Sequence, residues 1–182
     1  MSTLCRYLPI KFSIQTQGGD EMPYKIEEKG PIRIVGVRIP LTYDMDKNYK
    51  SISSFWEQIK QSEIFCQILN LNNTPQKKVF GISIYNESDE VYYYIAAVTD
   101  KPVPEGMYEY EIPASIWAVF ESQGLFKESI QTIYKRFFTE WLPFSGYRYT
   151  EIADVEVYPV YDEIRVSVYA EIWMSIKKEK ES

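Results

Sequence analysis

The stretch SVYAEIWMSIKK, residues 167–178, has the residue alternation of a β-strand with one buried face. Successive side chains of a strand point to opposite faces of its sheet. The face that carries Glu171 also carries Tyr169 and Trp173, so an acid lies between two aromatic residues. We therefore expect helices to pack on one side of this sheet and a Tyr-Glu-Trp row to lie on the other. The helix-facing series is apolar throughout: Val166, Val168, Ala170, Ile172, Met174 and Ile176.

Strand and helix patterns follow one another in the same order twice along the chain. In the helix pattern of the first half, Ser54 and Glu57 have the spacing of a capping box, and Pro113 interrupts the first strand pattern of the second half. In the first half the predicted elements are a strand from residue 32, a helix over 51–65, and strands over 78–86 and 90–100. In the second half they are a strand over 107–122, a helix over 125–141, and strands over 154–160 and 163–178.

One βαββ unit cannot bury its sheet alone, but two units related by a pseudo-twofold axis can share one curved sheet. We predict an α+β fold of duplicated βαββ units, with a curved antiparallel sheet and two helices on its outer face. The halves are expected at about residues 31–100 and 107–178, within a domain of residues 25–182. Residues 1–24 contain only a short strand pattern, PIKFSI, and are interpreted as an N-terminal appendage.

The composition excludes several classes of function. The chain of 182 residues has a net charge of -6 and no histidine, which argues against nucleic-acid binding and removes His-dependent catalytic and zinc sites. The two cysteines, Cys5 and Cys66, are far apart, and no close-spaced metal or redox pair is present. No signal peptide or membrane-spanning run is found. We expect a soluble, cytoplasmic protein that needs no cofactor or metal and has neither nucleic acid nor membrane as a partner.

Aromatic residues make up 16% of the chain, which together with its negative charge favours cation binding. Tyr92 and Tyr94 share one strand face and could converge with the row around Glu171, and Trp117 is a further candidate. An exposed face with ordinary cross-strand aromatic pairs explains the same pattern equally well. The pair Asp154 and Glu156 is interpreted as a solvated strand face rather than an acid–base site.

The chain resembles the GyrI-like small-molecule-binding family, which is related to the effector-binding domains of AraC-type and MerR-type multidrug regulators. The segments that carry the resemblance are IVGV, FGISIYN, YYYIAAVTDKPVPEGMYEYEIPASIWAVFESQG, IYKRFFTEWLPFSGYRYTEIADVEVYP and YAEIWMSIK, between about residues 24 and 178.

The resemblance implies a central ligand cavity that accepts amphipathic, often cationic compounds. It places Glu171 at the family's acidic position in the last strand and Trp117 in a segment that borders the pocket. Ser175 stands where relatives commonly have proline. Since no helix-turn-helix or basic segment precedes the domain, we expect a stand-alone member rather than a regulator.

The leading hypothesis is therefore a protein that binds or sequesters aromatic, cationic small molecules. Glu171 would supply the counter-charge, and the candidate walls are Tyr169, Trp173, Trp117, Tyr92 and Tyr94. An alternative is a hydrolase of electrophilic compounds, with Glu171 as its catalytic general acid or base. A further alternative, implied by the family alone, is a module that binds and inhibits DNA gyrase.

Overall fold

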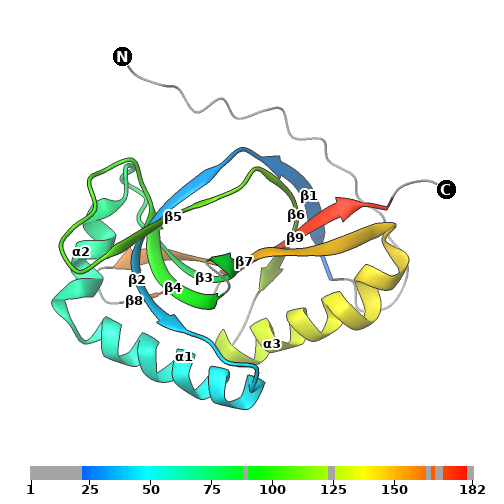
Figure 1. Cartoon of the computed structure of the whole chain (residues 1–182), viewed down its shortest axis with the longest axis horizontal. Helices are drawn as coiled ribbons and strands as arrows, with labels where there is room; N and C mark the ends of the chain where they lie inside the picture. The colour runs from blue at the N-terminus through cyan, green and yellow to red at the C-terminus, as the bar shows by residue number, and fades with distance from the viewer. Residues whose placement is uncertain (1–21, 88–89, 123–125, 163–164, 167–169, 180–182) are drawn as a thin grey trace.

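The computed structural model describes residues 22–87, 90–122, 126–162, 165–166 and 170–179 (Figure 1). The expected appendage, the strand pattern PIKFSI and Tyr169 lie outside these residues. The described strands are β1 (Tyr24–Lys29), β2 (Ile32–Pro40), β3 (Lys78–Glu87), β4 (Glu90–Val98), β5 (Tyr108–Ile112), β6 (Ser115–Ser122), β7 (Tyr147–Asp162), β8 (Arg165–Val166) and β9 (Ala170–Lys178). The helices are α1 (Met45–Lys60), α2 (Glu63–Leu71) and α3 (Phe126–Arg136).

All described strand pairs are antiparallel, in the order β1-β6-β9-β7-β3-β4-β2-β5, and β8 lies beside β7. The predicted α+β class with an antiparallel sheet is confirmed. Each half contributes its strands to the sheet in the same order, β3-β4-β2 in the first and β7-β9-β6 in the second. The duplication itself and the central cavity stay predictions.

Two sharp bends make the sheet curve. Only Gly30 and Pro31 separate β1 from β2, and only Pro113 and Ala114 separate β5 from β6. Yet β1 pairs with β6 at one end of the strand order, and β2 pairs with β5 at the other. The sheet therefore has to curve until its two ends approach each other, as Figure 1 shows. The interruption predicted at Pro113 is one of these bends, whereas β1 was not predicted as a strand.

The first helix begins earlier than the predicted capping box. Asp44 is its N-cap and accepts a hydrogen bond from the backbone N–H of Lys47 at 3.1 Å, so Ser54 lies inside α1. The helix ends at Lys60, and α2 follows after a short break. The second predicted helix is α3, continued by a π-helical turn, Phe137–Trp141, and a 3-10 turn, Leu142–Phe144.

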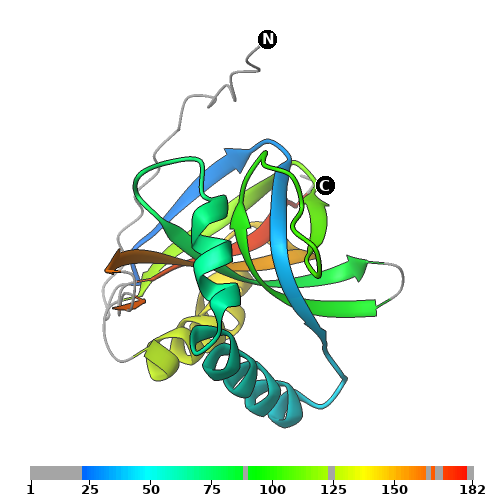
Figure 2. The ribbon, with the colours of Figure 1, turned by 90° about the vertical axis from the view of Figure 1, so that its left-hand side faces the viewer.

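The sheet separates two hydrophobic cores. Figures 1 and 2 show α1 and α3 on the same side of the sheet, which we call the outer face, and the sheet curves around its inner face. The described members of the predicted helix-facing series, Ala170, Ile172, Met174 and Ile176, lie in the outer core. The inner core includes Ile34, Phe80, Ile82, Ile84, Tyr94, Trp117, Val119, Val155 and Val157. Most of these side chains are shielded from water, which supplies the main stabilisation of the fold.

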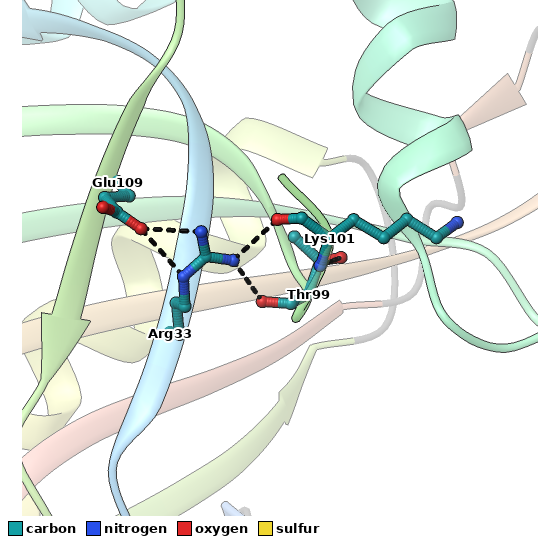
Figure 3. A network of polar contacts seen from close by, with 4 residues as sticks. All are labelled: Arg33, Thr99, Lys101 and Glu109. Atoms are coloured by element: carbon teal, nitrogen blue, oxygen red, sulfur yellow. Dashed lines mark hydrogen bonds and ion pairs between the residues drawn. The ribbon is translucent and has the colours of Figure 1, made fainter. Parts of the chain in front are cut away.

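A polar clasp fixes the connection between the halves (Figure 3). Two guanidinium nitrogens of Arg33 on β2, Nε and Nη2, contact the same carboxylate oxygen of Glu109 on β5, at 2.9 and 2.6 Å. It also donates to the backbone carbonyls of Thr99 and Lys101, at 2.9 and 3.0 Å. The segment after β4 is thus tied to the paired strands β2 and β5. None of the helices in the described part of the chain is long and apolar enough to cross a membrane.

Candidate functional site

Two carboxylates of β7 lie on the outer face, beneath the helices. Asp154 is only 4% exposed and Glu156 is partly buried. Both side chains point to the same side as the outer-core residue Tyr158, because residues two apart on a strand share a face. The prediction that this pair forms a solvated face is therefore wrong. An alternating acid pattern does not reveal that helices cover it.

Asp154 accepts hydrogen bonds from phenols of two strands. Tyr85 on β3 donates to Oδ2 at 2.6 Å, and Tyr149 on β7 donates to Oδ1 at 2.9 Å. The rings of Tyr85 and Tyr149 pack edge to face with centroids 6.4 Å apart. Both carboxylate oxygens of Asp154 thus have a phenolic partner.

Glu156 is held by phenols from three elements. Tyr158 on β7 and Tyr93 on β4 donate to Oε2 at 2.6 and 3.0 Å. Tyr134 on α3 reaches Oε1 at 3.5 Å, which is long for a hydrogen bond. The hydroxyl of Tyr93 also accepts from the indole N–H of Trp56 on α1, at 2.8 Å. We call the two acids with Tyr85, Tyr93, Tyr134, Tyr149 and Tyr158 the acid–phenol cluster.

A bulge in β7 and a glycine on β3 bring the cluster together. The pairing of β7 with β9 shifts between Tyr149 and Asp154, where Glu151 has a φ of 51°. This bulge puts Tyr149 and Asp154 on one face although they are five residues apart. On β3, Gly81 leaves room for the cluster, since a Cβ there would lie 2.2 Å from the Tyr93 hydroxyl and 2.8 Å from Glu156 Oε2.

Burial controls the electrostatics of the cluster. It raises the pKa of Asp154 to about 7 against the lowering effect of the Tyr85 and Tyr149 hydrogen bonds, and the charges of Glu156 and Glu151 raise it further. Burial likewise raises the pKa of Glu156, opposed by its phenolic hydrogen bonds. Among the described residues, neither acid forms an ion pair.

The phenols remain protonated donors. Burial, followed by the negative charge of Glu156 or Asp154, raises the pKa of every tyrosine in the cluster above its ordinary value. The cluster is thus negatively charged when its acids are ionised, and it has no cationic side chain to balance that charge. Such a site can bind a cation, and it can hold or release a proton near neutral pH.

The described residues among the predicted counter-charge and pocket walls lie on the other face of the sheet, and Tyr169 is outside the described part of the chain. Trp173 donates its indole N–H to Glu171 at 3.0 Å. Its ring packs edge-on against that of Trp117, with centroids 6.0 Å apart. The inner core contains Trp117 and Tyr94 as buried members. Tyr92 and Trp173 are partly buried and pack against it. We call Glu171, Trp173, Trp117, Tyr92 and Tyr94 the aromatic row.

Two of the protein's own cations already contact the aromatic row. The ammonium of Lys29 lies 4.4 Å from the ring centroid of Trp173. The guanidinium of Arg38 lies 3.9 Å from the ring centroid of Tyr92 and 4.2 Å from that of Tyr108, and it donates to the Tyr94 hydroxyl at 2.9 Å. The rings of this face therefore have the geometry of cation–π binding.

A surface groove of about 410 Å³ lies near the acid–phenol cluster. Tyr149, whose hydroxyl donates to Asp154, is one of its walls. Its other walls are Leu142, Pro143, Gly146, Tyr147, Arg148 and Glu179. Over the described ranges, no group of three or more His, Cys, Asp or Glu side chains is arranged to hold a metal ion.

Comparison with known structures identifies the same fold elsewhere. SAV2435, whose structure was determined with bound tetraphenylphosphonium, matches 86% of this chain and 94% of its own at 20% identity and a TM-score of 0.73. The integron cassette protein Cass2 of Vibrio cholerae matches 85% of this chain and 95% of its own at 14% identity and a TM-score of 0.58. The C-terminal domain of EcmrR matches 87% and 99% at 18% identity and a TM-score of 0.53.

At these identities the structural likeness establishes the fold alone. A search of curated proteins finds no match. The family model described as Cass2, integron-associated effector binding protein, matches residues 25–176, which is most of the chain. The chain therefore belongs to this integron-associated effector-binding family, which bears out the effector-binding class that the resemblance implied.

Proposed function

We propose that the protein binds amphipathic aromatic cations, with Asp154 and Glu156 as their counter-charge. The observation that carries the proposal is that these covered carboxylates accept hydrogen bonds from phenols but form no ion pair among the described residues. A buried carboxylate without a cation is costly and takes up a proton instead, as the raised pKa values of both acids reflect. A bound cation relieves that cost.

The aromatic surroundings suit such a ligand. Trp56 from α1 and Tyr134 from α3 cover the acids from opposite halves of the chain, and their rings supply apolar area around a central charge. Because these side chains fill the site, the ligand has to displace them to reach Glu156. The tetraphenylphosphonium bound to the structural neighbour SAV2435 supports the choice of a lipophilic cation as a probe.

The aromatic row is a second location for the counter-charge, as the sequence suggested. Its supporting observation is the Lys29 ammonium over Trp173, next to the Trp173–Glu171 hydrogen bond. We favour the acid–phenol cluster because its acids are covered and have no ion pair with any side chain that the structure describes, whereas the aromatic row already contacts the cations of Lys29 and Arg38.

Titration of tetraphenylphosphonium, followed by tryptophan fluorescence and calorimetry at about pH 8, tests the proposal. The variants are Asp154→Asn with Glu156→Gln, and separately Glu171→Gln. Glu57→Gln is the matched control, since Glu57 lies on the exposed side of α1. Neutral triphenylphosphine oxide reports the part of the affinity that does not depend on charge. Recovery of the probe by chromatography shows whether it is turned over.

We expect the double variant to weaken phosphonium binding by about tenfold or more, because it removes the counter-charge, and to leave phosphine oxide binding unchanged. If only Glu171→Gln loses affinity for tetraphenylphosphonium, the counter-charge is Glu171, in the aromatic row. Wild-type affinity in both variants would refute a carboxylate counter-charge at either place. Steady consumption of a reactive cationic analogue would favour the hydrolase alternative over simple binding.

A further inference from the structure

Strand β1 places three charged side chains on the inner face, beside the tryptophans. Lys25, Glu27 and Lys29 alternate along β1, and Glu27 lies opposite Trp117 in the β1–β6 register. Glu27 forms ion pairs with both lysines, at 3.4 Å with Lys25. Burial raises the pKa of Glu27, but the hydrogen bond and charge of Lys29 and the charge of Lys25 lower it more, so this acid is ionised at neutral pH.

The two lysines differ in their contact with the aromatic row. Of the two, Lys29 is the one that contacts a ring of the described residues: its ammonium lies 4.4 Å from the centroid of Trp173. That indole donates to Glu171 at 3.0 Å, so the ammonium rests on a ring polarised by a carboxylate and is itself paired with Glu27. The face of a tryptophan ring attracts ammonium groups, and the carboxylates of Glu27 and Glu171 beside it add negative charge.

The neighbouring Trp117 carries a buried polar atom that has no partner among the described residues. Trp117 is fully buried, and its indole N–H donates to no acceptor in the described part of the chain. Its ring is 6.0 Å from that of Trp173. A buried donor of this kind is costly to leave unpaired. A ligand with an acceptor oxygen near its ammonium group would satisfy the indole while it replaces the lysine.

The contacts of Lys29 are exchangeable. Its side chain is 23% exposed at the end of β1, where Gly30 follows. A partly exposed ion pair and one cation–π contact hold a flexible lysine weakly, and the released ammonium would be hydrated at once.

We propose that the inner face carries a second site, for small organic ammonium compounds with an acceptor oxygen, and that Lys29 occupies it as an internal competitor. The site is distinct from the acid–phenol cluster, since it lies across the sheet from Asp154 and Glu156. Its ligands are cations, like those of the proposed function, but their binding does not require Asp154 or Glu156.

The test compares Lys29→Met with Lys25→Met, using acetylcholine as the probe. Both changes remove one positive charge paired with Glu27, but only Lys29→Met vacates the ring of Trp173. Binding is followed by tryptophan fluorescence and by the indole N–H signals in NMR spectra. Trp173→Leu removes the ring, and tetramethylammonium lacks the acceptor oxygen. Each variant is also prepared with Asp154→Asn and Glu156→Gln. This separates binding at the acid–phenol cluster from binding at the inner-face site.

We expect Lys29→Met to tighten acetylcholine binding by about fivefold or more and Lys25→Met by less than about twofold, with a shifted indole signal of Trp117. Trp173→Leu should abolish the gain in acetylcholine affinity that Lys29→Met produces. The gain should persist when Asp154→Asn and Glu156→Gln are also present. If the two lysine variants change acetylcholine affinity equally, the lost positive charge alone explains the effect, and the proposal is overturned. An unchanged affinity in Lys29→Met would overturn it as well. If Lys29→Met does not fold, Lys29→Gln is judged by the same criteria.

Discussion

Glu156 depends on side chains that are distant in sequence. Tyr93 links this acid to α1, because its hydroxyl donates to the Glu156 carboxylate and accepts from the Trp56 indole. This chain of hydrogen bonds from Trp56 through Tyr93 to Glu156, which we call the relay, joins the sheet to a helix within an otherwise apolar core. Polar groups in such surroundings are stabilising only when every partner is present.

Tyr93→Phe should therefore destabilise the protein by about 2 kcal/mol, since it leaves the Trp56 N–H without an acceptor and removes one donor from Glu156. Urea unfolding measures the change. Tyr43→Phe is the control, because Tyr43 is fully exposed, and its unfolding midpoint should match that of the wild type. A midpoint for Tyr93→Phe equal to that of Tyr43→Phe would contradict the relay.

The limits of sequence reasoning are visible at these same residues. Alternation correctly separated Ala170, Ile172 and Met174 from Glu171 and Trp173. It could not reveal that α1 and α3 cover Glu156, because the cover comes from Trp56 and Tyr134, which belong to other elements. Nor could it place Tyr149 beside Asp154, because the bulge between them reverses the parity of β7.

Helix α1 shows why hydrophobic periodicity can fail to predict the first turns of a helix. Its first turns are mostly exposed, and their buried member is polar: Asn48 accepts from the backbone N–H of Thr42 at 2.8 Å and donates to its carbonyl at 2.7 Å. An apolar pattern begins only near Phe55, which is why the helix was predicted to start late. The strands were easier to predict, since β2, β3, β4, β6 and β9 each place alternate apolar residues on a buried face.

The clasp around Arg33 sets the stability of one element more than that of the whole. In Arg33→Met, hydrogen exchange of the β5 amides should accelerate by about tenfold, because β5 loses the Glu109 contact and the segment after β4 loses its tie. Global stability should fall by less than about 1 kcal/mol, since the ion pair is partly exposed.

Arg148→Met serves as the control, because the Arg148–Glu179 pair is more exposed and lies near the end of β9. It should leave the β5 amides unchanged. Uniform acceleration across all strands in Arg33→Met would show that the clasp stabilises the whole fold and not β5 with the segment that connects it to β4.

For the whole molecule, the two faces of the sheet differ in how charge is balanced. On the inner face, the charge of Glu27 is paired with Lys25 and Lys29. On the outer face, the partners of Asp154 and Glu156 among the described side chains are phenols, and protonation of the two acids relieves their charge. Ligand binding at the outer face should therefore be linked to proton release, whereas binding at the inner face exchanges one ammonium for another.

The affinity for tetraphenylphosphonium should consequently rise with pH. With the pKa of Asp154 at about 7, the cluster is increasingly neutral below that pH, and the cation, which does not titrate, loses its counter-charge. Apparent affinity should fall by up to about tenfold for each pH unit below about 7 and level off above about 8. Calorimetry in buffers of different ionisation enthalpy should detect the released proton. Asp154→Asn should flatten the profile, whereas a wild-type affinity that does not vary between about pH 5 and 8 would exclude the cluster as the counter-charge.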